Sequence, residues 1–390
     1  MTRVDLVLSD DWELRGDGSG DMRVIQFGTL WKLLEVYEHF NLRGSFFVEV
    51  LQQIRHREFS AQAPFLGELA DAWDTAVCDL FKRGHDVQLH IHPQWSNAEW
   101  IDGVWRLRGD WSILRYSRRD AETLLRQARD YLEALLGTVD QDYRCLAFRS
   151  GAWCLAPSEF MVPTLRTLGI RLDASIVQGV RYNERVELDY RELDEAFLPF
   201  FPRDDDARRL GSEPAGPVCL PVHSFTVPAW RRWQRSLSRL LGVERSWHGN
   251  CLAPSQVPIP GAAMNRYGGW GFTSTLNGSL FRVTSRLRRV LSGRLVVSDL
   301  SNLSRQDIDD MLVDIRRRAR RSCADAVPVV LANHTKDLGH LDSIRYLAER
   351  ISSSNDFEVV TVSEVLTRIE AGVYPVRRAG DGYENKSIGA

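Results

Sequence analysis

The chain lacks any hydrophobic run long enough to cross a membrane, since no stretch approaches the ~20 apolar residues that a spanning helix needs. Its first residues lead directly into a strand-like segment at 4–9 and lack the apolar core of a signal peptide. These two absences predict a cytoplasmic protein. The net charge of -2 over 390 residues offers no excess of positive charge, so no nucleic-acid partner is expected.

Cysteine and lysine are both sparse in this chain. The six cysteines are scattered and form no Cys-x-x-Cys pair, and in a chain without an export signal they are expected to be reduced thiols. Only four of the 50 basic residues are lysines, at positions 32, 82, 336 and 386, a bias that we attribute to base composition. A hydrophobic content of 44% is ordinary for a globular protein and is enough for a large core.

Strand-like and helix-like segments alternate along most of the chain. The expected strands are residues 4–9, 44–48, 87–91, 145–148, 170–176, 218–222, 327–332 and 357–362. The expected helices are residues 30–40, 65–82, 118–136, 157–168, 307–321 and 341–351. This alternation predicts an α/β fold with a parallel sheet or barrel built from βα units. Residues 224–303 break the rhythm, so we expect a barrel from 1–223 and 304–374, an insertion at 224–303 and a disordered tail at 375–390.

Polar residues, mainly aspartate and histidine, gather where the predicted strands end. Three of the nine histidines fall within residues 84–95, and His90 and His92 are two apart, so on a strand they share a face. The polar groups at strand ends are Asp10-Asp11, His90 and His92, Arg149, Asp173, and His334. In βα barrels the loops at the carboxyl ends of the strands form the active site. Taken alone, a His-x-His pair such as His90 and His92 is more often a strand end that carries polar residues than a metal site.

These residues suit the hydrolysis of an amide or ester. Asp11 with His90 and His92 would hold a divalent metal, most plausibly zinc, and leave a position open for water or substrate. Asp10 is the candidate general base, and Arg149 would keep its carboxylate ionised. His334 would protonate the leaving amine, with Asp173 orienting its ring.

The order of these motifs resembles that of the polysaccharide deacetylase family (NodB homology, carbohydrate esterase family four). The matching segments are Leu8-Ser9-Asp10-Asp11, Gly44-Ser45-Phe46-Phe47-Val48, Gly84-His85-Asp86-Val87-Gln88-Leu89-His90, Phe148-Arg149-Ser150-Gly151-Ala152-Trp153, Asp173-Ala174-Ser175 and Val329-Val330-Leu331-Ala332-Asn333-His334. The resemblance covers residues 4–223 and 304–370. It implies a distorted parallel (β/α) barrel and metal-dependent deacetylation. It also implies that Asp10 is the base, Asp11 and His90 are ligands, Arg149 and Asp173 are orienting residues, and His334 is the acid.

The wording Leu89-His90-Ile91-His92-Pro93-Gln94-Trp95 looks more like the WbmS-like subgroup, which is linked to bacterial surface-polysaccharide and O-antigen synthesis. The chain departs from the family at one point, because Gln94 stands where the second metal histidine is usual. We predict His92 as the ligand in its place, because imidazole is the better ligand for zinc and its neighbours, with Gln94 as the alternative. Because of this departure, a weaker metal site, or no metal site, stays open as an alternative.

Further residues are candidates for substrate binding. Trp153 could stack on a sugar or belong to the core, and His223 follows another predicted strand and could face the site. Lys336 could touch substrate or simply begin a loop.

The predicted insertion is rich in arginine and tryptophan. Between residues 224 and 294 the only acidic residue is Glu244, and apolar residues at 230, 233, 237, 240 and 241 keep a helical spacing. A basic amphipathic helix of this kind could contact a membrane surface or bind phosphate groups. Its arginines could instead pair with the acidic stretch 184–206, which would make the insertion a lid.

The function expected from the sequence is metal-dependent removal of an acetyl group, N-acetyl in preference to O-acetyl, from a nucleotide-linked, lipid-linked or polymeric sugar in surface-polysaccharide synthesis. One alternative is hydrolysis of a non-sugar amide or a formyl group on the same scaffold. Another is a catalytically inactive carbohydrate-binding or scaffold protein, which the missing second histidine would favour.

Overall fold

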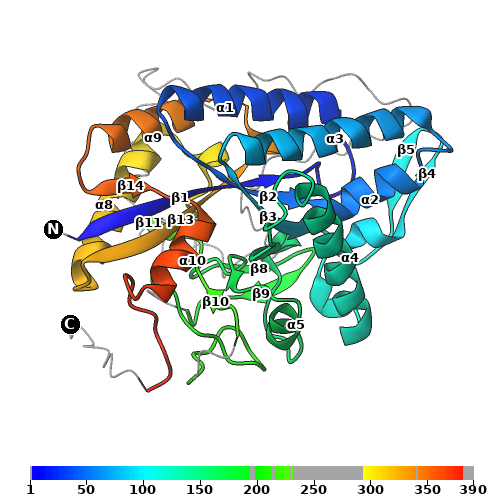
Figure 1. Ribbon diagram of the computed structural model, residues 1–390. Helices are drawn as coiled ribbons and strands as arrows, with labels where there is room; N and C mark the ends of the chain where they lie inside the picture. The colour runs from blue at the N-terminus through cyan, green and yellow to red at the C-terminus, as the bar shows by residue number, and fades with distance from the viewer. Residues whose placement is uncertain are drawn as a thin grey trace, which may run out of the picture.

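The computed structural model describes residues 2–193, 198–212, 216–228, 230–231, 293–339 and 341–380. Parallel strands form an eight-stranded sheet in the order β10-β7-β6-β3-β2-β1-β13, and β14 also pairs with β1 (Figure 1). The strands of this sheet are β1 (Arg3–Trp12), β2 (Ser45–Glu49), β3 (Asp86–Ile91), β6 (Ala147–Ser150), β7 (Leu172–Asp173), β10 (Val218–Cys219), β13 (Ala326–His334) and β14 (Phe357–Val359). Isolated parallel bridges join Val222 to Val177 and to Val330 of β13, so the sheet curls round from the β10 edge toward β13 at its other edge.

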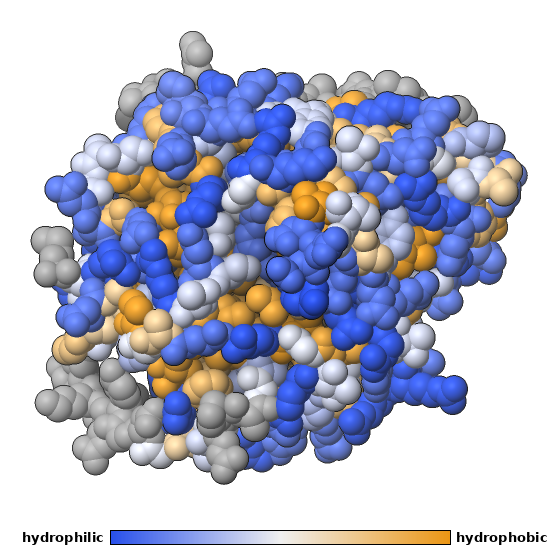
Figure 2. Space-filling model, in the orientation of Figure 1, coloured by the Kyte–Doolittle hydropathy of each residue, from blue (hydrophilic) through white to orange (hydrophobic). Residues whose placement is uncertain are grey.

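Helices cover the outside of the curled sheet, with α1 and α3 above β1 and β2 in Figure 1 and α4, α5 and α10 on the lower side. The helices are α1 (Thr29–His39), α2 (Val50–Glu58), α3 (Pro64–Lys82), α4 (Arg118–Leu136), α5 (Met161–Thr167), α8 (Arg305–Arg321), α9 (Asp342–Ser352) and α10 (Val362–Glu370). Figure 2 shows mainly hydrophilic residues on the helical part of this face, with hydrophobic residues visible between the elements. No helix among the described residues is long and apolar enough to cross a membrane.

The central strands are buried on both faces, because helices lie outside the sheet and side chains fill its curled interior. Every residue of β13 is buried, and so are Val4–Trp12 of β1. Strands of this kind read as continuous apolar runs, which is why the sequence locates them well. The predicted alternation of strands and helices is confirmed, and its boundaries for α3 and α4 agree to within one residue.

β1 is longer than the sequence suggests. The prediction ends this strand at residue 9, whereas β1 continues through Trp12 because it pairs with β13 from Arg3↔Ala326 to Asp11↔His334. Conversely, β7 contains only Leu172–Asp173 of the predicted strand 170–176. Three antiparallel pairs of short strands were not predicted, namely β4 (Ala98–Ile101) with β5 (Val104–Leu107), β8 (Arg181–Asn183) with β9 (Glu187–Asp189), and β11 (Ser224–Val227) with β12 (Arg294–Val297).

β11 and β12 join the two ends of the predicted insertion at the barrel. Of the predicted basic helix only Trp230 and Arg231 are described, and the rest of that prediction lies outside the described residues. In the predicted tail, Arg377 and Ala379 donate backbone hydrogen bonds to Pro199 and Gly211, whereas residues 381–390 lie outside the described residues. The domain boundaries given above therefore stay predictions.

His56, in α2, makes folding stability depend on pH. Its ring is buried against Trp95 and Trp105, and burial lowers its pKa to about 4. Between this value and the ordinary pKa of about 6.5 only the unfolded chain takes up the proton, so stability is lost as the pH falls. When the pH is lowered from 7 to 4.5, the free energy of unfolding of His56→Leu should fall by roughly 2 kcal/mol less than that of the wild type. Urea unfolding at the two pH values measures this difference. An equal fall in unfolding free energy for the wild type and His56→Leu would contradict it.

Candidate metal centre and flanking acid–base pairs

The carboxyl ends of β1, β2, β3, β6 and β13 bring polar side chains to one region. Strand pairing places Asp11 beside His334, Glu49 beside His90, and His90 beside Arg149. Because β1 stays extended past Asp10, its side chains continue to alternate between the two faces of the sheet. Asp11 therefore faces the same region as His90, and the side chain of Asp10 points to the opposite face.

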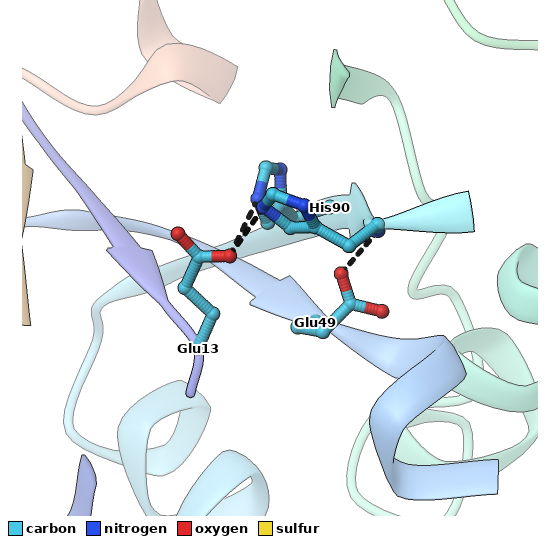
Figure 3. A group of neighbouring side chains, drawn as sticks. Glu13, Glu49 and His90 are labelled. Atoms are coloured by element: carbon cyan, nitrogen blue, oxygen red, sulfur yellow. Dashed lines mark hydrogen bonds and ion pairs between the residues drawn. The ribbon is translucent and has the colours of Figure 1, made fainter. Parts of the chain in front are cut away.

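Glu13, just past the end of β1, lies between the two histidines. Its Oε2 atom is 2.5 Å from Nε2 of His92 and 3.3 Å from Nε2 of His90, and all three side chains are buried. Figure 3 shows the Glu13 carboxylate, at the end of β1, pointing toward the imidazole of His90. Glu13, Glu49, His90 and His92 each offer a ligand atom, and these atoms lie within 4.8 Å of one another. Asp11 falls in a second such group, with Glu13 and His334.

Glu49 is tied to the backbone. Its Oε1 accepts hydrogen bonds from the N–H groups of Leu51 (2.9 Å) and Gln52 (3.2 Å) and so caps α2, and its Oε2 accepts one from the N–H of His92. Burial raises the pKa of Glu49 to about 8, so it is protonated at neutral pH. Glu49 therefore positions His92, and Glu13 is left as the carboxylate that faces both imidazoles.

Both histidines are held through the ring nitrogen that faces away from Glu13. Nδ1 of His90 is 2.8 Å from the carbonyl oxygen of Arg149, which only accepts, so Nδ1 carries the proton and donates. The Gln94 amide nitrogen is 3.0 Å from Nδ1 of His92 and donates to the carbonyl of Gly16 (3.1 Å). Gln94 thus orients His92 from behind. A ring N–H donated to a carbonyl oxygen, as at His90, is typical of histidines that bind metals.

The unpaired atoms of this group fit a divalent metal. With its proton on Nδ1, His90 turns the lone pair of Nε2 toward an oxygen of Glu13, and two acceptors in contact need a proton or a cation between them. Within the part of the chain that the structure describes, Glu13 Oε2 and His90 Nε2 are buried without a well-aligned hydrogen bond. Two imidazoles and a carboxylate are a donor set that suits zinc and its neighbours.

The pKa of Glu13 lies well below its ordinary value. Burial on its own would raise this pKa, but the interactions of Glu13 with His92, Lys336 and His90 outweigh burial. Glu13 is therefore ionised, as a metal ligand must be. Glu13 is not among the site residues predicted from the sequence, because the predicted strand ends at residue 9, before this position. One signal in the sequence could have identified Glu13. It lies two residues after Asp11, as His92 lies two after His90, and residues two apart on a strand share a face.

Arg149 and Asp11 form a fully buried ion pair at 2.5 Å. Arg149 also donates to the carbonyl of Ala174 (3.0 Å) and to the hydroxyl of Ser9 (2.8 Å), and its guanidinium lies over the ring of Phe47. Burial would raise the pKa of Asp11, but the charge of Arg149 outweighs it and the pKa is lowered. The sequence predicts this arginine beside Asp10, whereas the structure places it on Asp11 because the alternation of β1 continues.

His334 stands between two carboxylates. Its Nδ1 is 3.0 Å from Asp299 and its Nε2 is 3.4 Å from Asp11. Burial would lower the pKa of His334, but the charge of Asp299 outweighs it and raises the pKa to about 9. The sequence assigns the orienting role to Asp173 and places residue 299 in the insertion. Asp299 follows the apolar strand β12 and bridges to Ala332 of β13, so it shows the same strand-end pattern as the other site residues.

Three predicted residues lie apart from this group. Asp10 accepts hydrogen bonds from Tyr37 of α1 (3.0 Å) and from Asn333, and burial raises its pKa to about 7. Asp173 accepts hydrogen bonds from the hydroxyl (2.6 Å) and N–H of Ser175, and burial raises its pKa to about 7 as well. His223 contacts Ser298 (2.6 Å) and Asp314 (3.3 Å) in a separate buried pair.

The other two candidates reach the site. The ring of Trp153 lies 5.9 Å from that of His334, and Trp153 and Ala152 both adopt left-handed backbone angles. The hydroxyl of Tyr190 donates to the carbonyl of Trp153 (2.6 Å) and holds this uncommon conformation, of a kind that often marks functional sites. Lys336 contacts the second oxygen of Glu13.

Comparison with known proteins supports the fold. No protein-family model matches the sequence, and no curated protein is significantly similar to it. The chain is similar to the structure of a protein from Mycobacterium smegmatis assigned as a polysaccharide deacetylase, with a TM-score of 0.51 and 13% identity over 96% of this chain and 93% of that one. A protein of Pseudomonas aeruginosa PAO1 with the same assignment gives a TM-score of 0.47 and 9% identity over 95% and 92%. Puue allantoinase gives 0.46 and 11% over 95% and 91%.

The first of these similarities confirms the predicted fold class. The chain has an α/β fold whose parallel sheet curls into a distorted barrel of the polysaccharide deacetylase type. Within it lies a buried cluster of histidine and carboxylate side chains that could hold a metal ion. The WbmS-like subgroup and the individual site roles stay predictions.

Proposed function

We propose that this protein is a metal-dependent deacetylase that hydrolyses the N-acetyl group of a sugar. The observation that carries the proposal is the position of Glu13, His90 and His92 directly beside two ion pairs, Asp11 with Arg149 and His334 with Asp299. Deacetylation by water needs a polarised acyl group, a base for the water and an acid for the departing amine, and these groups supply all three.

The placement of the side chains changes two of the roles expected from the sequence. Glu13, His90 and His92 would hold the metal, because Oε2 of Glu13 faces the Nε2 atoms of both imidazoles. A divalent metal bound there would polarise the acyl carbonyl and acidify a water molecule. Asp11 takes the role of the base in place of Asp10, because it lies on the site face and Arg149 orients its carboxylate.

In the reaction, the water oxygen forms a bond to the acyl carbon while Asp11 accepts a proton from that water. His334, protonated at neutral pH because of Asp299, gives its proton to the amide nitrogen as the carbon–nitrogen bond breaks. The products are acetate and the free amino sugar. Trp153, beside His334, is the candidate wall for the sugar ring. The resemblance of residues 89–95 to the WbmS-like subgroup supports a substrate from bacterial surface-polysaccharide synthesis.

Acetate release tests the proposal. Purified protein should release acetate from nucleotide-linked or oligomeric N-acetylated amino sugars, should stop when a chelator removes the metal, and should recover when Zn²⁺ is added back. Activity that persists in chelator would contradict the metal mechanism. Release of formate or of another acid would identify a different acyl group. Neither metal binding nor release of any acid would favour a binding or scaffold protein.

A further inference from the structure

Lys336 is a buried cation inside the candidate site. It lies in the turn Thr335–Asp337 directly after β13, and its side chain is only 6% exposed. Its ammonium contacts Oε1 of Glu13. Lysine is rarely buried without a partner, because its charge loses water on burial. Lys32 and Lys82, by contrast, are exposed on the surfaces of α1 and α3.

The two oxygens of Glu13 face different partners. Oε2 faces His90 and His92, whereas Oε1 faces Lys336. Glu13 also belongs to the second group of potential ligands, with Asp11 and His334. The charge of Lys336 also acts on both of these residues, because it opposes the protonation of His334 and attracts the carboxylate of Asp11.

Two metal ions bridged by one carboxylate are a common arrangement in hydrolases. The carboxylate here would be Glu13, with His90 and His92 on one side and Asp11 and His334 on the other. The ammonium of Lys336 contacts Oε1 of Glu13 and its charge acts on both Asp11 and His334, so it already supplies a positive charge to the shared carboxylate.

The ion pairs around Glu13 agree with this reading. Glu13 is paired with Lys336, and Asp11 with Arg149, so each buried carboxylate already has a cation beside it. A divalent ion beside Glu13 meets the repulsion of a fixed ammonium, and this repulsion is strong where water is excluded.

We propose that Lys336 takes the place of a second metal ion, limits the centre to one divalent ion and weakens the binding of that ion. The proposal rests on the metal site of the proposed function. It also explains how the carboxylate of Glu13 stays fixed toward the histidines when the metal is absent, since Lys336 holds its other oxygen.

Metal binding by four forms of the full chain tests this role. The metal-free wild type, Lys336→Met, Lys336→Arg and the surface control Lys32→Met are titrated with Zn²⁺ by calorimetry, and with Co²⁺ by visible absorption. We expect one ion per chain for the wild type, Lys336→Arg and Lys32→Met, with similar affinities. Lys336→Met should bind the first ion at least about tenfold more tightly, and its metal-free form should melt at a lower temperature.

The outcomes separate the two proposals. No binding by the wild type would overturn the metal site itself, whereas wild-type binding with an unchanged affinity for Lys336→Met would overturn only the role of Lys336. Two ions bound to the wild type would also overturn that role. If Lys336→Met folds only when metal is present, the metal replaces the lost charge and the proposal is supported. If it folds in neither condition while Lys336→Arg folds, Lys336 is a structural ion-pair residue and the proposal fails.

Discussion

Replacing Glu13 with Gln should abolish metal binding and lower deacetylase activity by at least about a thousandfold. Gln keeps the shape of Glu13 but loses the negative charge, and its amide is a poor ligand for zinc. The Oε2 atom of Glu13 is the carboxylate oxygen that faces both His90 and His92. Titration with Zn²⁺ and the rate of acetate release measure the two effects.

Glu49 provides the matched control, because it is the other buried glutamate of the same group. It is protonated at neutral pH and capped by backbone N–H groups, so Glu49→Gln should bind metal within about tenfold of the wild type. Asp11→Asn should keep the metal but lose about 10²–10⁴ in rate, as expected for a base. If Asp11→Asn loses the metal while Glu13→Gln keeps it, then Asp11 is the metal ligand, as predicted from the sequence.

The difference between these two assignments shows what sequence reasoning could reach. The pattern of polar residues after apolar runs identified five residues that the structure brings to one region, namely Asp11, His90, His92, Arg149 and His334. That pattern is reliable because parallel strands buried on both faces are apolar until they end. Their carboxyl ends then meet at one edge of the sheet, whatever the loops between them do.

The exact role of each residue depends on contacts distant in sequence. β1 extends past Asp10 because β13, more than 300 residues away, pairs with it up to Asp11↔His334. This pairing turns Asp10 toward Tyr37 and brings Glu13 to the histidines. Asp299 likewise reaches His334 only because it bridges to Ala332. Strand ends and bridges of this kind are set by tertiary pairing, so local sequence preferences do not determine them.

The pair formed by His334 and Asp299 should control the alkaline limit of activity. His334 must be protonated to act as the acid, and Asp299 raises its pKa to about 9, so the rate should fall as the pH rises through this value. In Asp299→Asn the opposing charge is gone and burial then lowers the pKa of His334. The alkaline limb should therefore move to lower pH by at least about one unit. His334→Ala should lose about 10²–10⁴ in rate at every pH.

Asp314 provides a control for the Asp299→Asn variant, because it also pairs with a buried histidine but lies outside the candidate site. It contacts His223 at 3.3 Å and forms a second buried pair of aspartate and histidine, outside the group around Glu13. Asp314→Asn should leave the alkaline limb of kcat/KM where it is, even if the variant is less stable. The decisive measurement is the pH profile of kcat/KM for the wild type and both Asn variants. If Asp299→Asn keeps the wild-type limb, or if Asp314→Asn shifts it equally, then Asp299 does not set the proton affinity of the acid and the leaving amine takes its proton from another group.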